Sequence, residues 1–180
     1  MSELLIEDNS VQEALITLRR LVDLQVEEND LEEAVESYRQ ILSFDPGQTD
    51  AWLEELELLI RLQKREELLD RLPNAARALE ELQEAARLEP ILDRVLSAWP
   101  EDVALLTASS KIYHEFNNEK KAKELEQQLV TALVKSADAE QAEEVARGLL
   151  EKDPENAQLL TALAELQVRR GQEELAAKTL

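Results

Sequence analysis

Few residues in this chain could carry out chemistry. His114 is the only histidine and there is no cysteine, so His-pair zinc sites, thiolate sites and a cysteine nucleophile are excluded. Adjacent residues on a helix point about 100° apart, so two neighbouring glutamates do not form a catalytic pair of carboxylates. We interpret four such pairs as solvated helix surface: Glu32-Glu33, Glu54-Glu55, Glu80-Glu81 and Glu143-Glu144.

The remaining signatures of enzymes and cofactor sites are also missing from the sequence. It contains no Gly-rich phosphate loop, EF-hand loop or GxSxG motif. We therefore expect no enzyme, cofactor or metal site. Trp52 and Trp99 are interpreted as core residues, because no cluster of Lys or Arg accompanies either of them in the sequence.

The chain is strongly acidic, with 40 Asp and Glu against 20 Lys and Arg and a net charge of −20. No third of the sequence is net basic, so we expect neither nucleic acid nor an anionic membrane surface as a partner. A protein partner that presents basic or apolar residues is compatible with this charge. The sequence has neither a secretory signal nor a long apolar run, which predicts a cytoplasmic location.

Helical periodicity runs through every part of the chain. From Ala157 to Arg170 apolar residues recur three or four positions apart, as in a helix with one buried face. Gly171 then allows the positive φ of a tight turn, and acidic residues open the next helix. Two short antiparallel helices cannot cover their own apolar faces and need neighbouring pairs, so we expect an all-α fold of roughly 9–11 helices.

This pattern resembles the tetratricopeptide repeat (TPR), a helix–turn–helix unit of about 34 residues. Ala34, Tyr38 and Pro46 occupy its small, aromatic and proline positions, and Trp52 stands at its tryptophan position. The resemblance implies a single TPR-like domain over residues 1–180, a superhelical stack (α-solenoid) of antiparallel helix pairs. Its repeats are expected at about residues 15–48, 49–72, 103–136 and 157–180. Small residues should lie where neighbouring helices approach closely: Ala34, Ala122 and Ala176.

Two stretches depart from the repeat. Pro73 predicts the end of a helix over residues 66–72, with a new helix over residues 74–88. Two further prolines ten residues apart cannot both end standard repeats, so we interpret residues 73–100 as irregular helices. An extra helix over about residues 138–152 interrupts the alternation a second time.

The TPR resemblance also implies a binding face. In that family, side chains on the inner side of each first helix contact the ligand. Acidic Asp23, Glu57 and Glu165 stand where chaperone-binding members have asparagine, so capture of a terminal carboxylate is not expected. A mixed acidic and apolar groove instead suits an extended or helical segment that carries Lys or Arg and a few apolar anchors. The positions carried over are Arg19, Asp23, Asp50, Leu53, Glu57, Ile60, Lys111, His114, Glu115, Thr161, Glu165, Val168 and Arg169.

These observations favour an adaptor or scaffold that binds a protein segment in a concave acidic and apolar groove. The last helix stops at Leu180 without a polar cap, so we expect either that the chain is part of a longer protein or that its terminal helices form a homodimer. One alternative is a secretion-type TPR chaperone, similarly acidic but usually richer in glycine. A further alternative is an enzyme that uses carboxylates in the irregular middle.

Overall fold

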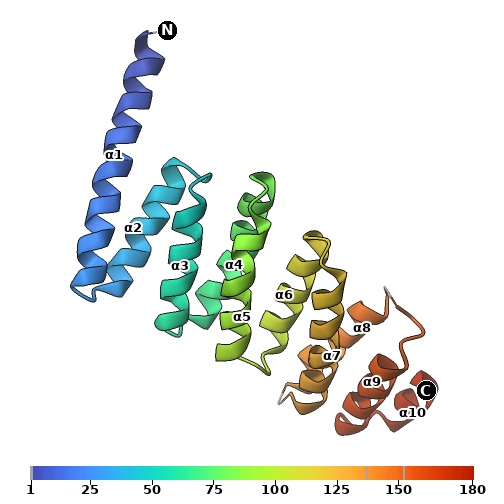
Figure 1. Ribbon diagram of the computed structural model, residues 1–180. Coiled ribbons are helices and arrows are strands. Elements are labelled where there is room, and N and C mark those ends of the chain that lie inside the picture. Colours follow the sequence, from blue (N-terminus) through green and yellow to red (C-terminus); the bar gives the residue numbers. More distant parts are fainter. Residues whose placement is uncertain (1, 137, 152) are drawn as a thin grey trace. The chain divides into compact units, whose positions relative to one another are not determined.

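The computed structural model describes residues 2–136, 138–151 and 153–180, with side-chain surroundings from Val11 onward. No residue in these ranges forms a strand, and the predicted all-α fold is confirmed. The helices follow one another along the chain (Figure 1) as α1 (Ser2–Glu27), α2 (Leu31–Phe44), α3 (Thr49–Arg61), α4 (Arg65–Glu81), the 3₁₀ helix η1 (Ala85–Leu88), α5 (Glu89–Ala98), α6 (Val103–Glu115), α7 (Glu119–Lys135), α8 (Ala139–Leu150), α9 (Ala157–Arg169) and α10 (Glu173–Thr179).

The helices form two compact units, one ending at Ala98 and the other beginning at Trp99. In the first unit each helix from α1 to α4 packs against the next, and α3 also contacts α5. In the second unit α6 packs against α7, α7 contacts α8 and α9, and α9 lies between α8 and α10. That the two units continue a single repeat stack stays a prediction.

Five helix ends share one kind of turn. In each, a residue with positive φ is followed by a residue whose N–H donates to the carbonyl five positions before it, at 2.7–2.9 Å. This is the Schellman motif, which satisfies backbone carbonyls at a helix end. Asn29 and Gln63 lie 34 residues apart, as do Gln83 and Asn117, so the turns repeat with the TPR period. The fold is therefore TPR-like. The residues with positive φ are Asn29, Gln63, Gln83, Asn117 and Gly171.

The chain does not break at Pro73, which corrects the helices expected over residues 66–72 and 74–88. Pro73 lies inside the continuous helix α4, and the turn comes later, at Gln83. A proline inside a helix costs about 3 kcal/mol. Leu72 and Leu79 on the same helix are fully buried, and burying each leucine contributes about 1.5–3 kcal/mol. The buried face of α4 thus outweighs the cost of the proline.

Pro73→Ala is expected to stabilise the protein by about 1–2 kcal/mol, since it restores one helical hydrogen bond at an exposed position. The gain stays below the full cost of a proline because alanine leaves the unfolded chain freer. Thermal melting followed by circular dichroism measures the change. Asn74→Ala, at the adjacent exposed position, serves as the control, and a lower melting temperature for Pro73→Ala would contradict the prediction.

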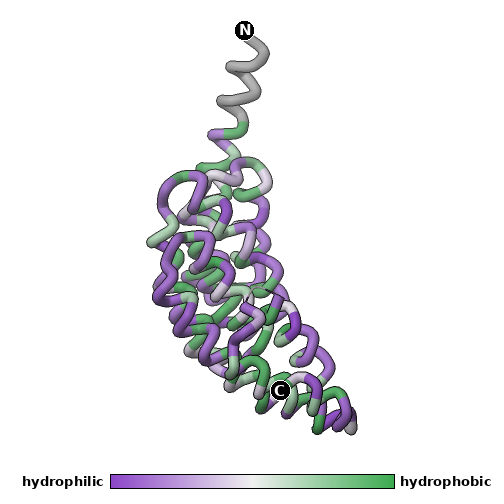
Figure 2. The backbone as a smooth tube through the Cα atoms, turned by 90° about the vertical axis from the view of Figure 1, so that its right-hand side faces the viewer, coloured by the Kyte–Doolittle hydropathy of each residue, from purple (hydrophilic) through white to green (hydrophobic). Residues whose placement is uncertain are grey.

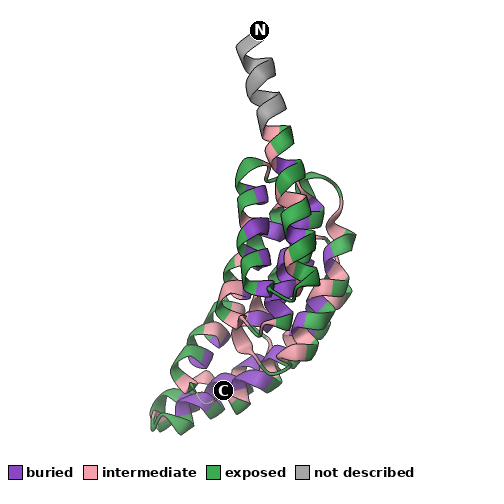
Figure 3. Cartoon of the chain, turned by 90° about the vertical axis from the view of Figure 1, so that its left-hand side faces the viewer, coloured by how far each residue is buried: buried purple, intermediate pink, exposed green. Residues whose placement is uncertain are grey.

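Hydrophobic and hydrophilic residues alternate along the coloured part of the chain (Figure 2). The buried residues gather on the sides where helices of one unit face each other, while exposed residues lie outside (Figure 3). The three small positions expected at close helix contacts, Ala34, Ala122 and Ala176, are all buried. The extra helix expected over about residues 138–152 corresponds to α8, and residue 152 lies outside the described residues.

Candidate functional site

One face of α3 is only partly covered in the first unit, where η1 and α5 lie beside it. Asp50 is exposed and Leu53 and Glu57 are half-buried, whereas Ala51 and Leu59 on the opposite side are buried. The open positions recur at intervals of three and four, so they form a single stripe along the helix. Three of the residues predicted to bind a partner thus share one accessible surface.

Arginines from neighbouring helices neutralise the acids of this stripe. Arg87 in η1 pairs with Asp50 and lowers the pKa of its carboxyl group, mainly through a hydrogen bond. Arg94 in α5 pairs with Glu57. The stripe is therefore a row of ion pairs around Leu53 rather than the openly acidic groove expected from the sequence.

The α1 side of this surface is joined to α3 through Arg19. Its guanidinium donates to Glu54 at 3.2 Å and to Gln48 at 3.3 Å. Asp23, one turn further along α1, is exposed and has no ion pair among the described residues. Ile60 differs from its neighbours: it is only 7% exposed and packs in the core, so it does not extend the accessible stripe.

In the second unit, α9 presents a similar stripe. Thr161, Glu165 and Val168 are exposed and fall four and three residues apart, hence on one face of the helix. Val168 is 52% exposed, which leaves an apolar side chain accessible beside a carboxylate. Arg169 does not extend this face, because its guanidinium donates to the carbonyls of Val134 and Ser136 at 2.6 and 2.7 Å.

The predicted residues on α6 are held by local ion pairs. Lys111 approaches Glu115 at 3.9 Å, and both are exposed. His114 lies between Glu126 on α7, 2.9 Å from its Nε2, and Glu119, 3.3 Å from its Nδ1. The hydrogen bond to Glu126 is the largest cause that raises the pKa of His114. His114 thus joins α6 to α7, and only part of its ring is open to a partner.

Because the folded pKa of His114 is raised, its ion pairs should stabilise the fold below the unfolded pKa of about 6.5. That contribution is lost as the pH rises through the folded pKa. We expect His114→Gln to cost up to about 1 kcal/mol at pH 5.5 and less at pH 9, since both partners are partly exposed. Urea unfolding at the two pH values measures the difference.

Proton NMR gives an independent test, because the chain has a single histidine. The titration midpoint of His114 should lie above 6.5 and fall in Glu126→Gln. Glu124→Gln, an exposed position on the same helix, is the matched control. An unshifted midpoint in the unsubstituted protein would show that the carboxylates do not hold the ring.

Two glutamates that were expected to be solvated are instead buried, which corrects the interpretation of their pairs. Glu55 on α3 is fully buried and accepts hydrogen bonds from Arg39 on α2, at 3.0 Å, and from Arg71 on α4, at 2.8 and 2.7 Å. This network connects three consecutive helices. Glu54, its neighbour, is exposed.

Glu143 on α8 plays a similar part in the second unit. Burial alone raises the pKa of its carboxyl group, but hydrogen bonds from Arg147 and Arg170 outweigh that effect and lower it. Arg147 lies on the same helix and Arg170 directly follows α9, so the carboxylate of Glu143 joins these two helices. Both glutamates therefore serve the packing of the helices.

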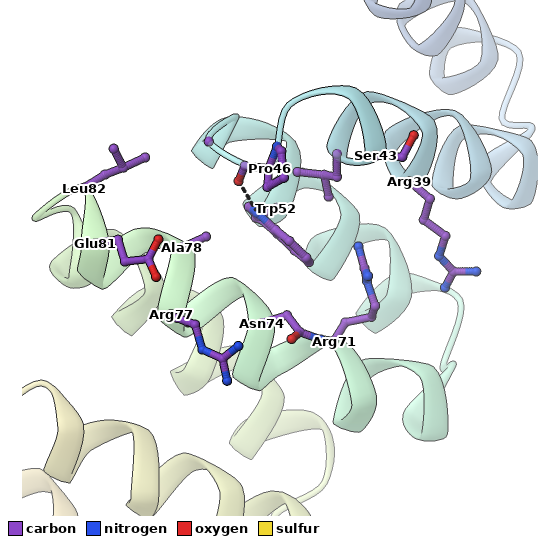
Figure 4. A pocket seen from close by; sticks show the side chains of 12 residues that line it. Arg39, Ser43, Pro46, Trp52, Arg71, Asn74, Arg77, Ala78, Glu81 and Leu82 are labelled. Atoms are coloured by element: carbon purple, nitrogen blue, oxygen red, sulfur yellow. Dashed lines mark hydrogen bonds between the residues drawn. The ribbon is translucent and has the colours of Figure 1, made fainter.

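The sequence reasoning missed a cleft of about 500 Å³ between α2 and α4, on the opposite side of α3 from Leu53. Trp52 lies at its centre, with Pro46 on one side and Asn74 and Ala78 of α4 on the other (Figure 4). Arg71 stacks on the Trp52 ring, 4.3 Å from its centroid. The sequence signal was a row of residues at helical spacing on α4: Arg71, Asn74, Ala78 and Glu81.

No described helix is long and apolar enough to span a membrane. No protein-family model and no curated protein matches the chain. Similar solved structures include YrrB, a TPR protein with an unusual peptide-binding site (17% identity, 98% of this chain and 87% of that one, TM-score 0.34). They also include MamA (12% identity, 93% of this chain and 88% of that one, TM-score 0.33). A third is PilF of Pseudomonas aeruginosa (18% identity, 94% of this chain and 90% of that one, TM-score 0.32). At this level the likenesses carry no functional argument, and the fold rests on the helix pairs themselves.

Proposed function

We propose that the protein is an adaptor that binds a peptide or a helical segment of a protein partner along the open faces of its first helices. The observation that carries the proposal is the stripe of Asp50, Leu53 and Glu57 on α3. It leaves an apolar side chain partly accessible among charged groups. In the second unit, Thr161, Glu165 and Val168 on α9 offer a comparable face.

The chemistry of the stripe suggests a partner segment with apolar anchors and basic residues. Ion pairs on a surface contribute little to stability, about 0–1 kcal/mol. A Lys or Arg of the partner can therefore compete with Arg87 for the exposed Asp50 at small cost, while Asp23 is already free to pair. An apolar anchor would cover Leu53. The apolar contact should set the lifetime of the complex, and the acids its specificity and salt dependence.

The proposal is tested with a short amidated peptide that carries Leu and Lys at helical spacing. Leu53→Ala should raise the dissociation rate of this peptide about three- to tenfold, since truncating an interface side chain acts mainly on dissociation. Glu57→Lys should slow association and flatten its salt dependence, because it removes an attractive charge. Surface plasmon resonance at several salt concentrations gives both rates.

The matched control is Glu80→Lys, which makes the same change of charge at an exposed position on α4, away from the stripe. It should leave both rates within about twofold of those of the unsubstituted protein, because salt screens a charge that lies away from the bound peptide. If the charge-reversed peptide with Glu for Lys binds equally well, or if neither Leu53→Ala nor Glu57→Lys alters binding, the stripe is not the binding face.

Two further expectations remain predictions. Self-association through terminal helices is supported by exposed apolar residues on α1, where Ile16 is 54% and Leu24 is 56% exposed. Sedimentation that gives a monomer at high micromolar concentration would exclude it. A cytoplasmic location is consistent with an adaptor of this kind, and fractionation of cells that express the native protein tests it.

A further inference from the structure

The cleft between α2 and α4 has rigid walls. The indole N–H of Trp52 donates to the carbonyl of Pro46 at 2.9 Å, and Arg71 covers part of the ring. Arg71 is in turn held by two hydrogen bonds to the buried Glu55, which Arg39 also contacts. A binding surface fixed in this way loses little side-chain freedom when a ligand arrives.

The lining of the cleft is largely apolar, with Leu42 and Trp52 at its buried floor, 5% and 6% exposed. Its volume of about 500 Å³ lies in the range of ligand-binding pockets, and it admits a large aliphatic or aromatic side chain. Leu82 at one end is 50% exposed, so an apolar ligand would cover surface that is now in water. The apolar lining residues are Leu42, Pro46, Trp52, Ala78 and Leu82.

Some charged side chains at the cleft already have ion-pair partners within the protein, and others do not. Arg39 and Arg71 are already paired with Glu55. Arg77 is exposed at the rim, points away from the ring and has no ion pair among the described residues (Figure 4). Glu81 lies one turn further along α4. The rim therefore offers one unpaired cation in the last third of α4 and one carboxylate at its end.

We propose that this cleft is a second docking site, for a protein segment in which a large apolar side chain stands beside a carboxylate. The apolar side chain packs on Pro46, Ala78 and Leu82 at the edge of the Trp52 ring, and the carboxylate pairs with Arg77. The site lies on the other side of α3 from the stripe of Asp50, Leu53 and Glu57, so it is independent of the function proposed for that stripe. A nucleic acid is a poor occupant, because a chain of net charge −20 repels a polyanion.

The test is a titration of the full chain, followed by two-dimensional ¹⁵N NMR. The probe is a short acetylated and amidated peptide with one Phe and a neighbouring Glu in an Ala and Gln host. The two tryptophans give two indole N–H signals, and Trp52→Phe identifies the one in the cleft. We expect the Trp52 signal and the backbone amides from Arg71 to Leu82 to shift, while the Trp99 signal stays in place.

Changes in the probe and the protein should act in defined directions. Phe→Ala in the peptide should abolish the shifts, and Glu→Lys should weaken binding. Arg77→Gln should weaken the Phe and Glu peptide about two- to fivefold, the range for an exposed ion pair, whereas Glu81→Gln should strengthen it. Arg20→Gln, an exposed arginine on α1, is the matched control and should change nothing.

Several results would overturn the proposal. One is the absence of any shift at millimolar peptide, and another is equal binding of the Glu and Lys peptides. Shifts of the same signals with protein concentration alone would assign the cleft to a second copy of the chain. Tighter binding of oligothymidine than of the peptide at Trp52 would assign it to stacking of nucleic acid bases.

Discussion

Glu55→Ala is expected to destabilise the protein by about 2–4 kcal/mol. Removing one partner of a buried ion pair typically costs about 3–5 kcal/mol, because the remaining charge is left without compensation. The side chains of Arg39 and Arg71 are 29% and 21% exposed, so water can hydrate them in part and the cost is reduced. The substitution also leaves a cavity between α2, α3 and α4.

Urea unfolding followed by circular dichroism measures this effect. Glu54→Ala is the matched control, because it removes the adjacent glutamate, which is exposed, pairs with Arg19 and hydrogen-bonds Tyr38. It should cost less than about 1 kcal/mol. Equal effects of the two substitutions would mean that Glu55 is solvated, as the sequence first suggested, and that the three helices are not connected through it.

Glu55→Gln separates charge from shape. Glutamine keeps the volume and one acceptor, so we expect a smaller loss of stability than with alanine. It should also loosen Arg71 over the Trp52 ring, since one of the two hydrogen bonds to Arg71 is lost or weakened. The exposure of the ring would then rise, which makes Glu55 a residue that positions the walls of the cleft.

The features predicted well are those fixed by local sequence. Apolar residues at helical spacing predict a helix and its buried face together, so the exposed positions of α3 and α9 could be assigned in advance. Gly171 also identified a reversal that the structure has, because few residues adopt positive φ easily. Gln63 and Gln83 carry no such signal, although they occupy the same conformation.

Pro73 shows why the cleft was missed. The rule that proline ends a helix is local, whereas Leu72 and Leu79 are buried through contacts with other helices. Once the helix was divided at Pro73, Arg71 and Ala78 no longer belonged to one face, and the row beside Trp52 disappeared. The sequence showed no cluster of Lys or Arg beside Trp52, and the structure places the single arginine Arg71 on its ring.

The burial of Glu55 had a signal in the sequence that the adjacent Glu54 obscured. Positions four before and three after Glu55 are Ala51 and Leu58, both buried, so helical spacing places Glu55 on the inner face. The sequence could not predict which side chains neutralise the buried charge of Glu55. Arg39 and Arg71 are each 16 residues away, on different helices, and only the packing of α2 and α4 against α3 brings them together.

Ala122→Leu is expected to destabilise the second unit by about 1–3 kcal/mol through overpacking. Ala122 on α7 is fully buried, and its carbonyl accepts a hydrogen bond from Ser110 on α6 at 3.4 Å. Ser109 and Ser110 are themselves small and buried, so α6 and α7 approach each other closely at this level. A leucine there must displace a helix or adopt a strained rotamer.

Thermal melting of Ala122→Leu measures this cost, and Gln128→Leu on the same helix provides the control. Gln128 is exposed, so leucine there should change the free energy of unfolding by no more than about 0.5 kcal/mol. Ala122→Gly should also destabilise, by about 1 kcal/mol, through loss of helix propensity rather than through crowding. Ser110→Gly distinguishes the two causes, because it opens space opposite Ala122. Combined with Ala122→Leu it should recover part of the lost stability, whereas combined with Ala122→Gly it should recover none. If Ala122→Leu melts like the unsubstituted protein, α6 and α7 do not meet at this residue and the register of the pair is different.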